Sequence, residues 1–178
     1  MIYKNIEKKY KSDITDLFTS VFTQSEGADE GALVGSLVAK LCTSIDDKEV
    51  ICFAAYDGNE LVGTVFCTHL NFGGDEKIYM LAPVAVSTEH QGKGVGQGLI
   101  NHALNKLKER SVEVVVTYGD PAYYSKVGFQ ALPEGVLQAP LTLSIPEGWL
   151  GQSLLGKAIP VISQRPTCVK EFNDSVYW

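Results

Sequence analysis

The chain has 178 residues, of which 45% are hydrophobic and 20% are charged, a composition typical of one globular domain and not of a disordered chain. Its formal net charge of −6 argues against a nucleic-acid partner, because such partners normally meet a basic surface. The sequence has no uninterrupted run of 18 apolar residues, and its alternating, charged N-terminus is unlike a signal peptide. We therefore predict a cytoplasmic protein with no membrane partner.

The first part of the chain predicts one strand and two helices. Residues 2–8 alternate between apolar and polar side chains, as a half-buried strand does. Apolar residues then recur at helical spacing over residues 12–22 and again over residues 32–41. The polar segment 27–31 between these helices suits either a solvated junction or contact with a substrate amine.

The next part predicts a hairpin and a third strand. Two apolar runs, residues 50–56 and 61–71, are joined by Asp57-Gly58-Asn59-Glu60, a sequence typical of tight hairpin turns. The glycine-containing segment 71–76 predicts a turn, and the apolar segment 77–86 predicts the strand that follows it.

A helix, a strand and a short helix are predicted after this hairpin. Residues 95–110 carry a buried apolar face, and the β-branched run 112–118 has the length of a strand. Asp120 suits the N-cap of the short helix, and Pro121 suits its first position. Gly128 is a natural residue to end it.

The last part of the chain has a weaker pattern. We predict a strand over residues 141–145, a short helical turn over residues 149–155 and a closing strand over residues 168–172. Trp149 and Trp178 are expected to be exposed, and exposed tryptophans suggest a homodimer contact.

The most informative segment is residues 84–99, where a strand runs into a glycine-spaced turn and then into a helix. This order leaves backbone N–H groups without partners at the positive end of a helix dipole, a suitable place for a phosphate. A dinucleotide fingerprint is excluded because its third glycine would fall on Gln97 or Leu99. A P-loop is excluded because Gly94, not serine or threonine, follows Gly92-Lys93.

What remains is a Q-x-x-G-x-G signature at residues 91–96, preceded by the strand Leu81–Val86. This arrangement closely resembles the pyrophosphate-binding motif of the GCN5-related N-acetyltransferases (GNAT), which bind acetyl-CoA. A second element of that family, a tyrosine, three residues and then Gly-Phe, matches Tyr124 and Gly128-Phe129. The run GDPAYYSKVGF resembles the YhbS-like branch of the superfamily.

The resemblance implies an α/β (α+β) fold built as a single N-acetyltransferase domain over residues 1–178, with a core at 2–150 and a C-terminal extension at 151–178. Its sheet is expected to be mixed, mostly antiparallel and of about seven strands, with helices on both faces. The fourth and fifth strands are expected to splay apart.

The resemblance also implies the sites of acetyl-CoA. The backbone of Val84, Ala85 and Val86 is expected to bind pantetheine, and Pro83 supports this because a proline marks a place where strands part. Tyr124 is expected to lie beside the CoA sulfur and to protonate the departing thiolate, with Tyr123 as the alternative. The diphosphate is expected to bind residues of the glycine turn: Gln91, Gly92, Lys93, Gly94, Val95 and Gly96.

The general base is harder to assign. Many relatives carry a glutamate eleven residues before the motif glutamine, where this chain has Met80. Glu76 is the base we name, with His69, Tyr79 or an ordered water as alternatives. No cysteine or histidine spacing indicates a metal site, and Cys52 and Cys67 lie in apolar runs that suit core positions.

The sequence therefore predicts an acetyl-CoA-dependent N-acetyltransferase that moves an acetyl group to a primary amine of a small molecule or peptide. Two alternatives stay open. The chain could be an acyl-CoA-binding sensor or scaffold without turnover, which Met80 favours. It could also be a nucleotide-binding enzyme that uses the same glycine turn.

Overall fold

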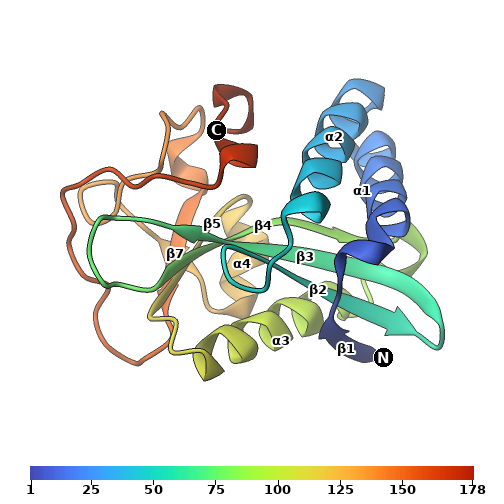
Figure 1. The fold of residues 1–178 in the computed structure, drawn as a ribbon, viewed down its shortest axis with the longest axis horizontal. Coiled ribbons are helices and arrows are strands. Elements are labelled where there is room, and N and C mark those ends of the chain that lie inside the picture. Colours follow the sequence, from blue (N-terminus) through green and yellow to red (C-terminus); the bar gives the residue numbers. More distant parts are fainter. The chain divides into compact units, whose positions relative to one another are not determined.

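The structure is a computed structural model that describes residues 1–178. Seven strands form a sheet in the order β1-β2-β3-β4-β5-β7-β6 (Figure 1). Strands β4 and β5 pair in parallel, whereas the β1–β2, β5–β7 and β6–β7 pairs are antiparallel, so the sheet is mixed as predicted. The strands are β1 (Ile2–Asn5), β2 (Val50–Asp57), β3 (Glu60–Leu70), β4 (Ile78–Val86), β5 (Val114–Tyr118), β6 (Gln130–Ala131) and β7 (Trp149–Ser153).

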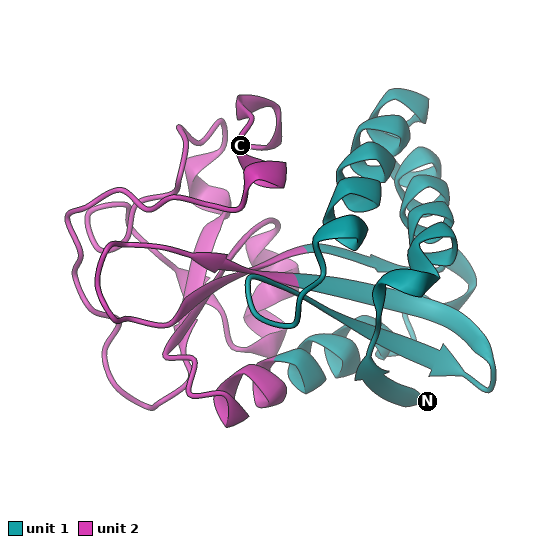
Figure 2. Ribbon diagram, in the orientation of Figure 1, with its two compact units in different colours: residues 1–66, 83–103 teal, residues 67–82, 104–178 magenta.

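The chain divides into two compact units (Figure 2). Unit 1 contains residues 1–66 and 83–103, and unit 2 contains residues 67–82 and 104–178. In unit 1, the helices α1 (Lys11–Glu26) and α2 (Ala28–Ser44) lie on one side of the strands, and the first part of α3 (Val95–Glu109) lies on the other (Figure 2). No helix combines the length and the apolarity that crossing a membrane requires.

In unit 1, helices α1 (Lys11–Glu26) and α2 (Ala28–Ser44) are separated by one residue, Gly27. Its φ of +103° lies in the region that favours glycine. The predicted break at residues 27–31 is therefore too long. Asp29 and Glu30 belong to the first turn of α2, where the helix dipole favours acidic side chains.

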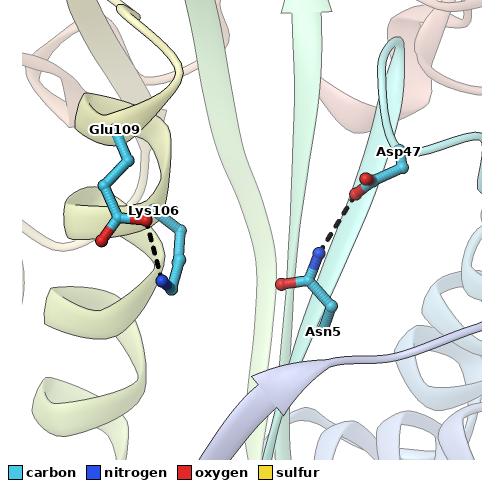
Figure 3. Close-up of polar contacts among 4 residues, drawn as sticks. All are labelled: Asn5, Asp47, Lys106 and Glu109. Carbon is cyan, nitrogen blue, oxygen red and sulfur yellow. Dashed lines mark hydrogen bonds and ion pairs between the residues drawn. The ribbon is translucent and has the colours of Figure 1, made fainter.

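A loop of unit 1 joins α2 to β2 and is organised by one carboxylate. The Asp46 Oδ1 atom accepts hydrogen bonds from the backbone N–H groups of Lys48, Glu49 and Val50, at 2.8–3.0 Å. The neighbouring Asp47 accepts a hydrogen bond from the Asn5 side chain of β1, at 3.1 Å (Figure 3). These contacts fix the entry of the chain into β2.

The same figure shows an ion pair of unit 2 within α3. Lys106 Nζ lies 2.8 Å from Glu109 Oε2, one turn further along the helix (Figure 3). Both side chains are largely solvent-exposed, so the pair adds little to stability.

In unit 2, β5 pairs over its whole length with β7, from Val114↔Ser153 to Tyr118↔Trp149. The predicted helical turn at residues 149–155 is therefore wrong, because this segment completes a ladder with a strand far away in the sequence. The predicted boundary between residues 150 and 151 falls inside β7.

Two further sequence predictions for the last part of the chain are wrong. Residues 141–145 form no strand, and the segment predicted as a closing strand contains the 3-10 helix Lys170–Phe172. Trp149 and Trp178 are only 1% and 5% exposed. Each indole N–H donates to a backbone carbonyl, of Leu137 and Phe172 respectively, so neither side chain supports a dimer contact.

The cysteines that were expected in the core lie there. Cys52 and Cys67 are buried, and all four cysteines are free thiols. Burial raises the pKa of the Cys67 thiol well above its ordinary value, which favours the neutral form.

Candidate functional site

In unit 1, the segment after β4 makes a tight turn before α3 begins. Strand β4 ends at Val86, Ser87 follows it, and the 3-10 helix η2 (Thr88–His90) leads into the turn. Gly92 and Gly94 have φ angles of +70° and +79°, which glycine adopts without strain. A Cβ added at either glycine would have no neighbour within 4 Å, so both face open space.

The backbone hydrogen bonds of this turn leave a cluster of free donors. The N–H groups of His90 and Gln91 donate to the carbonyls of Ser87 and Thr88, and the N–H of Gly98 donates to Gly94. No backbone acceptor is present for the N–H groups of residues 92–97 between them. These donors lie at the N-terminus of the 15-residue helix α3, whose dipole adds positive potential. The arrangement fits a diphosphate.

Gln91 contacts the end of β4, and its expected part in binding the diphosphate stays a prediction. Its side-chain Nε2 donates to the Val86 carbonyl at 3.0 Å, and its own N–H is used within η2. Gln91 therefore ties the turn to the end of β4. Lys93 is exposed, and its charge is free to meet an anion. Val95 is buried, so its side chain anchors the start of α3 while its N–H stays in the donor cluster.

The last residues of β4 are those predicted to bind pantetheine. The strand continues through Pro83 to Val86, with Ala85 and Val86 buried and Val84 half-buried. The Ala85 carbonyl lies 3.3 Å from where a Cβ on Gly63 would stand, which shows how closely β3 and β4 approach here. That Val84, Ala85 and Val86 bind pantetheine stays a prediction.

In unit 2, the backbone pairing between β4 and β5 ends at Met80 and Val116. The backbone register runs from Ile78↔Val114 to Met80↔Val116. Beyond it, the side-chain hydroxyl of Thr117 donates to the Leu81 carbonyl at 2.7 Å. Met80 is 1% exposed and has no titratable group, so the position of the family glutamate supplies no base.

Tyr124 lies in the short helix α4 (Pro121–Tyr124) of unit 2. As predicted, Asp120 caps this helix by accepting a hydrogen bond from the Ala122 N–H at 2.9 Å. Gly128, with a φ of +93°, ends the 3-10 turn that follows. A Cβ at Gly119 would stand 2.6 Å from the Tyr124 ring, so only glycine there allows the ring its position.

The Tyr124 side chain is half-buried, and its hydroxyl lies within hydrogen-bonding reach of Thr117. Burial raises the pKa of Tyr124 to about 12, although a hydrogen bond with Thr117 lowers it in part and the nearby Tyr123 raises it. Tyr124 is therefore protonated at neutral pH and is available as a donor. Thr117 was not identified from the sequence. Its signal was a hydroxyl inside an otherwise apolar β-branched run.

The structure separates Glu76 from Tyr124 along the sheet of unit 2. Glu76 precedes Ile78, the first residue of β4, whereas Thr117 contacts Leu81 three residues further along. Three residues of strand span about 10 Å. Glu76 is therefore too far from the Tyr124 region for direct proton transfer, and a proton would pass between them only through a relay. Two other candidate bases, His69 and Tyr79, lie together with ring centroids 5.3 Å apart.

No group of three or more histidine, cysteine, aspartate or glutamate side chains is arranged to hold a metal ion.

The chain is similar in sequence to two uncharacterized N-acetyltransferases of Escherichia coli (strain K12). It is 33% identical to YhbS over 78 residues, which are 43% of this chain and 47% of YhbS. It is 34% identical to YjhQ over 108 residues, which are 57% of this chain and 59% of YjhQ. The chain thus spans about half the length of the curated relatives it matches.

Solved structures share the fold over nearly the whole chain. YhbS from Escherichia coli in complex with CoA has a TM-score of 0.80 at 23% identity, covering 98% of this chain and 92% of that one. A GNAT acetyltransferase from Brucella melitensis in complex with acetyl-CoA has a TM-score of 0.70 at 21% identity, covering 97% of each chain. The model of the acetyltransferase (GNAT) family matches residues 12–129. This match takes in more than half of the chain, which therefore belongs to the acetyltransferase (GNAT) family.

Proposed function

We propose that this protein transfers the acetyl group of acetyl-CoA to a primary amine by direct attack on the thioester. The observation that carries the proposal is the cluster of backbone N–H groups at residues 92–97, which has no backbone acceptor of its own and faces open space at Gly92 and Gly94. Family membership and the CoA and acetyl-CoA complexes of the two structural neighbours support the choice of anion.

In this proposal, binding relies on the backbone of unit 1. The N–H groups of residues 92–97 hold the diphosphate, and Lys93 adds charge. The backbone of Val84, Ala85 and Val86 pairs with the pantetheine amides, as an added strand pairs with a sheet edge. Side chains have a small part in this binding, because the donors are main-chain groups.

The chemistry relies on side chains. The amine nitrogen attacks the thioester carbon, the C–S bond breaks, and the amine loses a proton to a base. Tyr124 stabilises the leaving sulfur. Its pKa of about 12 keeps it protonated, whereas a free thiol titrates near pH 8.5. Tyr124 therefore acts by donating a hydrogen bond as negative charge builds on the sulfur. Because the tyrosinate would be the stronger base, the proton stays on Tyr124, and the released thiolate takes its proton from solvent.

Transfer also needs a base and an acceptor amine. We assign Glu76 as the base acting through water, because Met80 offers no proton acceptor and Glu76 lies ahead of the same strand. The acceptor is a small-molecule or peptide amine. A homodimer and a cytoplasmic location stay predictions from the sequence.

The experiment that tests the proposal separates binding from turnover. Calorimetry with CoA measures the affinity, and release of free thiol from acetyl-CoA with a panel of amines measures transfer. The proposal expects both. Binding without amine-dependent thiol release would favour the sensor or scaffold, which Met80 supports. Absence of CoA binding by folded protein, together with thermal stabilisation by nucleotides, would instead favour a nucleotide-binding enzyme.

A further inference from the structure

In unit 1, three side chains in successive contact, Ser87, His90 and Asp57, join the turn after β4 to the β2–β3 hairpin. The Ser87 Oγ atom lies 2.8 Å from His90 Nδ1. On the other side of the ring, His90 Nε2 lies 3.5 Å from Asp57 Oδ2 at the end of β2. The two nitrogens of one imidazole thus contact groups on two different segments.

His90 lies where these contacts can orient the turn. His90 is the last residue of η2 and immediately precedes the turn whose N–H groups have no acceptor. The direction in which the turn leaves η2 decides whether those groups point to a common centre. A ligand site binds more tightly when such directions are fixed before the ligand arrives.

Apolar packing against the neighbouring helix cannot fix η2 by itself. A cavity of about 450 Å³ lies between α1 and the segment 87–89. A hydrogen bond from Thr88 Oγ1 to Gln24 Oε1 at 2.7 Å crosses it. The side-chain contacts at Ser87, His90 and Gln91 therefore help to fix the conformation of the turn.

We propose that Ser87, His90 and Asp57 form a positioning device that holds the donor cluster at residues 92–97 ready for the diphosphate of coenzyme A. The inference rests on the proposed function. Serine, histidine and aspartate also make hydrolytic triads, but there the aspartate is buried. The Asp57 side chain is 61% exposed and the serine contact lies within one turn, so the arrangement suits an anchor and not a nucleophile.

The first experiment replaces the ring without removing its bulk. His90→Phe keeps a planar side chain and loses both polar contacts, so we expect CoA to bind about three- to tenfold more weakly, the range of one or two hydrogen bonds. His90→Gln retains an amide that can make one of these contacts, so its CoA affinity should lie between those of His90→Phe and the unchanged protein. The melting temperature of both variants should stay close to that of the unchanged protein.

A second pair of variants separates positioning from charge. Asp57→Ala and Glu60→Ala each remove one exposed carboxylate from the same hairpin, and only Asp57 contacts His90. Removing negative charge alone favours an anionic ligand. The positioning role therefore predicts different outcomes: weaker CoA binding for Asp57→Ala, and unchanged or tighter binding for Glu60→Ala.

A double variant tests whether the side chains act together. If Ser87 works through His90, then Ser87→Ala should cost little affinity once His90→Phe is present. Equal CoA affinity in His90→Phe and the unchanged protein, additive losses in the double variant, or the same change in CoA affinity for Asp57→Ala and Glu60→Ala would each overturn the inference. Failure of the unchanged protein to bind CoA would overturn the proposed function instead.

Discussion

Unit 1 contains two clusters of backbone N–H groups, and they differ in what meets them. The N–H groups of residues 48–50 converge on the Asp46 carboxylate of the same loop. The N–H groups of residues 92–97 converge on no backbone acceptor. The comparison shows that the chain satisfies the donor cluster of the α2–β2 loop internally and leaves the donor cluster at residues 92–97, where we propose that an anion binds, without a backbone acceptor.

The open cluster and the proposed acid differ in the groups that they offer. The donors of the cluster are backbone N–H groups, whereas the titratable donor suited to a leaving thiolate, Tyr124, belongs to unit 2. Changes in the two places should therefore alter different measured quantities, which allows each role to be tested separately.

The largest expected effect follows from removing one hydroxyl. Tyr124→Phe should lower kcat about 100-fold, the lower range for a positioned acid, and leave CoA affinity nearly unchanged. Because burial raises the pKa of Tyr124 to about 12, its deprotonation should not limit the rate below about pH 11. The measurement is the pH dependence of thiol release with an amine that serves as acceptor.

Tyr123→Phe is the matched control for this prediction. Tyr123 adjoins Tyr124, with ring centroids 5.1 Å apart, and it is the alternative acid of the sequence analysis. A large loss of kcat in Tyr123→Phe, with activity kept in Tyr124→Phe, would reverse the assignment.

The next effect concerns the open cluster itself. Gly94→Ala should weaken CoA binding about tenfold, because a Cβ would project into the space left for the anion and would strain a φ of +79°. Gly156→Ala is the control, since Gly156 has a φ of +68° and equally open surroundings in unit 2. Both variants should lose similar stability, roughly 1 kcal/mol. Equal CoA affinities in the two variants would contradict the binding role of the turn.

The elements that depend on local sequence patterns were predicted correctly. The hairpin turn at Asp57–Glu60, the helix after Gly94 and the cap at Asp120 all depend on residues a few positions apart, and the structure contains each of them. The glycine turn was identifiable for the same reason.

The features that depend on distant residues could not be predicted in this way. Residues 149–153 become a strand because β5 is there to pair with them, and Trp178 is buried because the tail folds back over its own carbonyl at Phe172. The contacts of Thr117 with Leu81 and of His90 with Asp57 join separate segments, so no spacing along the chain announces them.

The smallest expected effect tests the filled cluster that serves as the reference. Asp46→Ala leaves three backbone donors of the α2–β2 loop without their acceptor and should lower the free energy of unfolding by about 1–2 kcal/mol near pH 7. Burial raises the pKa of Asp46, but the hydrogen bonds from Val50, Lys48 and Glu49 outweigh it, and the net pKa lies below its ordinary value.

The sign of the pH dependence follows from this lowered pKa. A carboxylate whose pKa is lower in the folded state stabilises the fold above its unfolded pKa, and this stabilisation is lost as the pH falls through the folded value. Denaturant titrations of Asp46→Ala and the unchanged protein should therefore differ most above about pH 5 and converge below about pH 3. CoA affinity should be the same in both. A loss of affinity in Asp46→Ala would mean that the two clusters are coupled, and the division between a donor cluster for the fold and one for the ligand would fail.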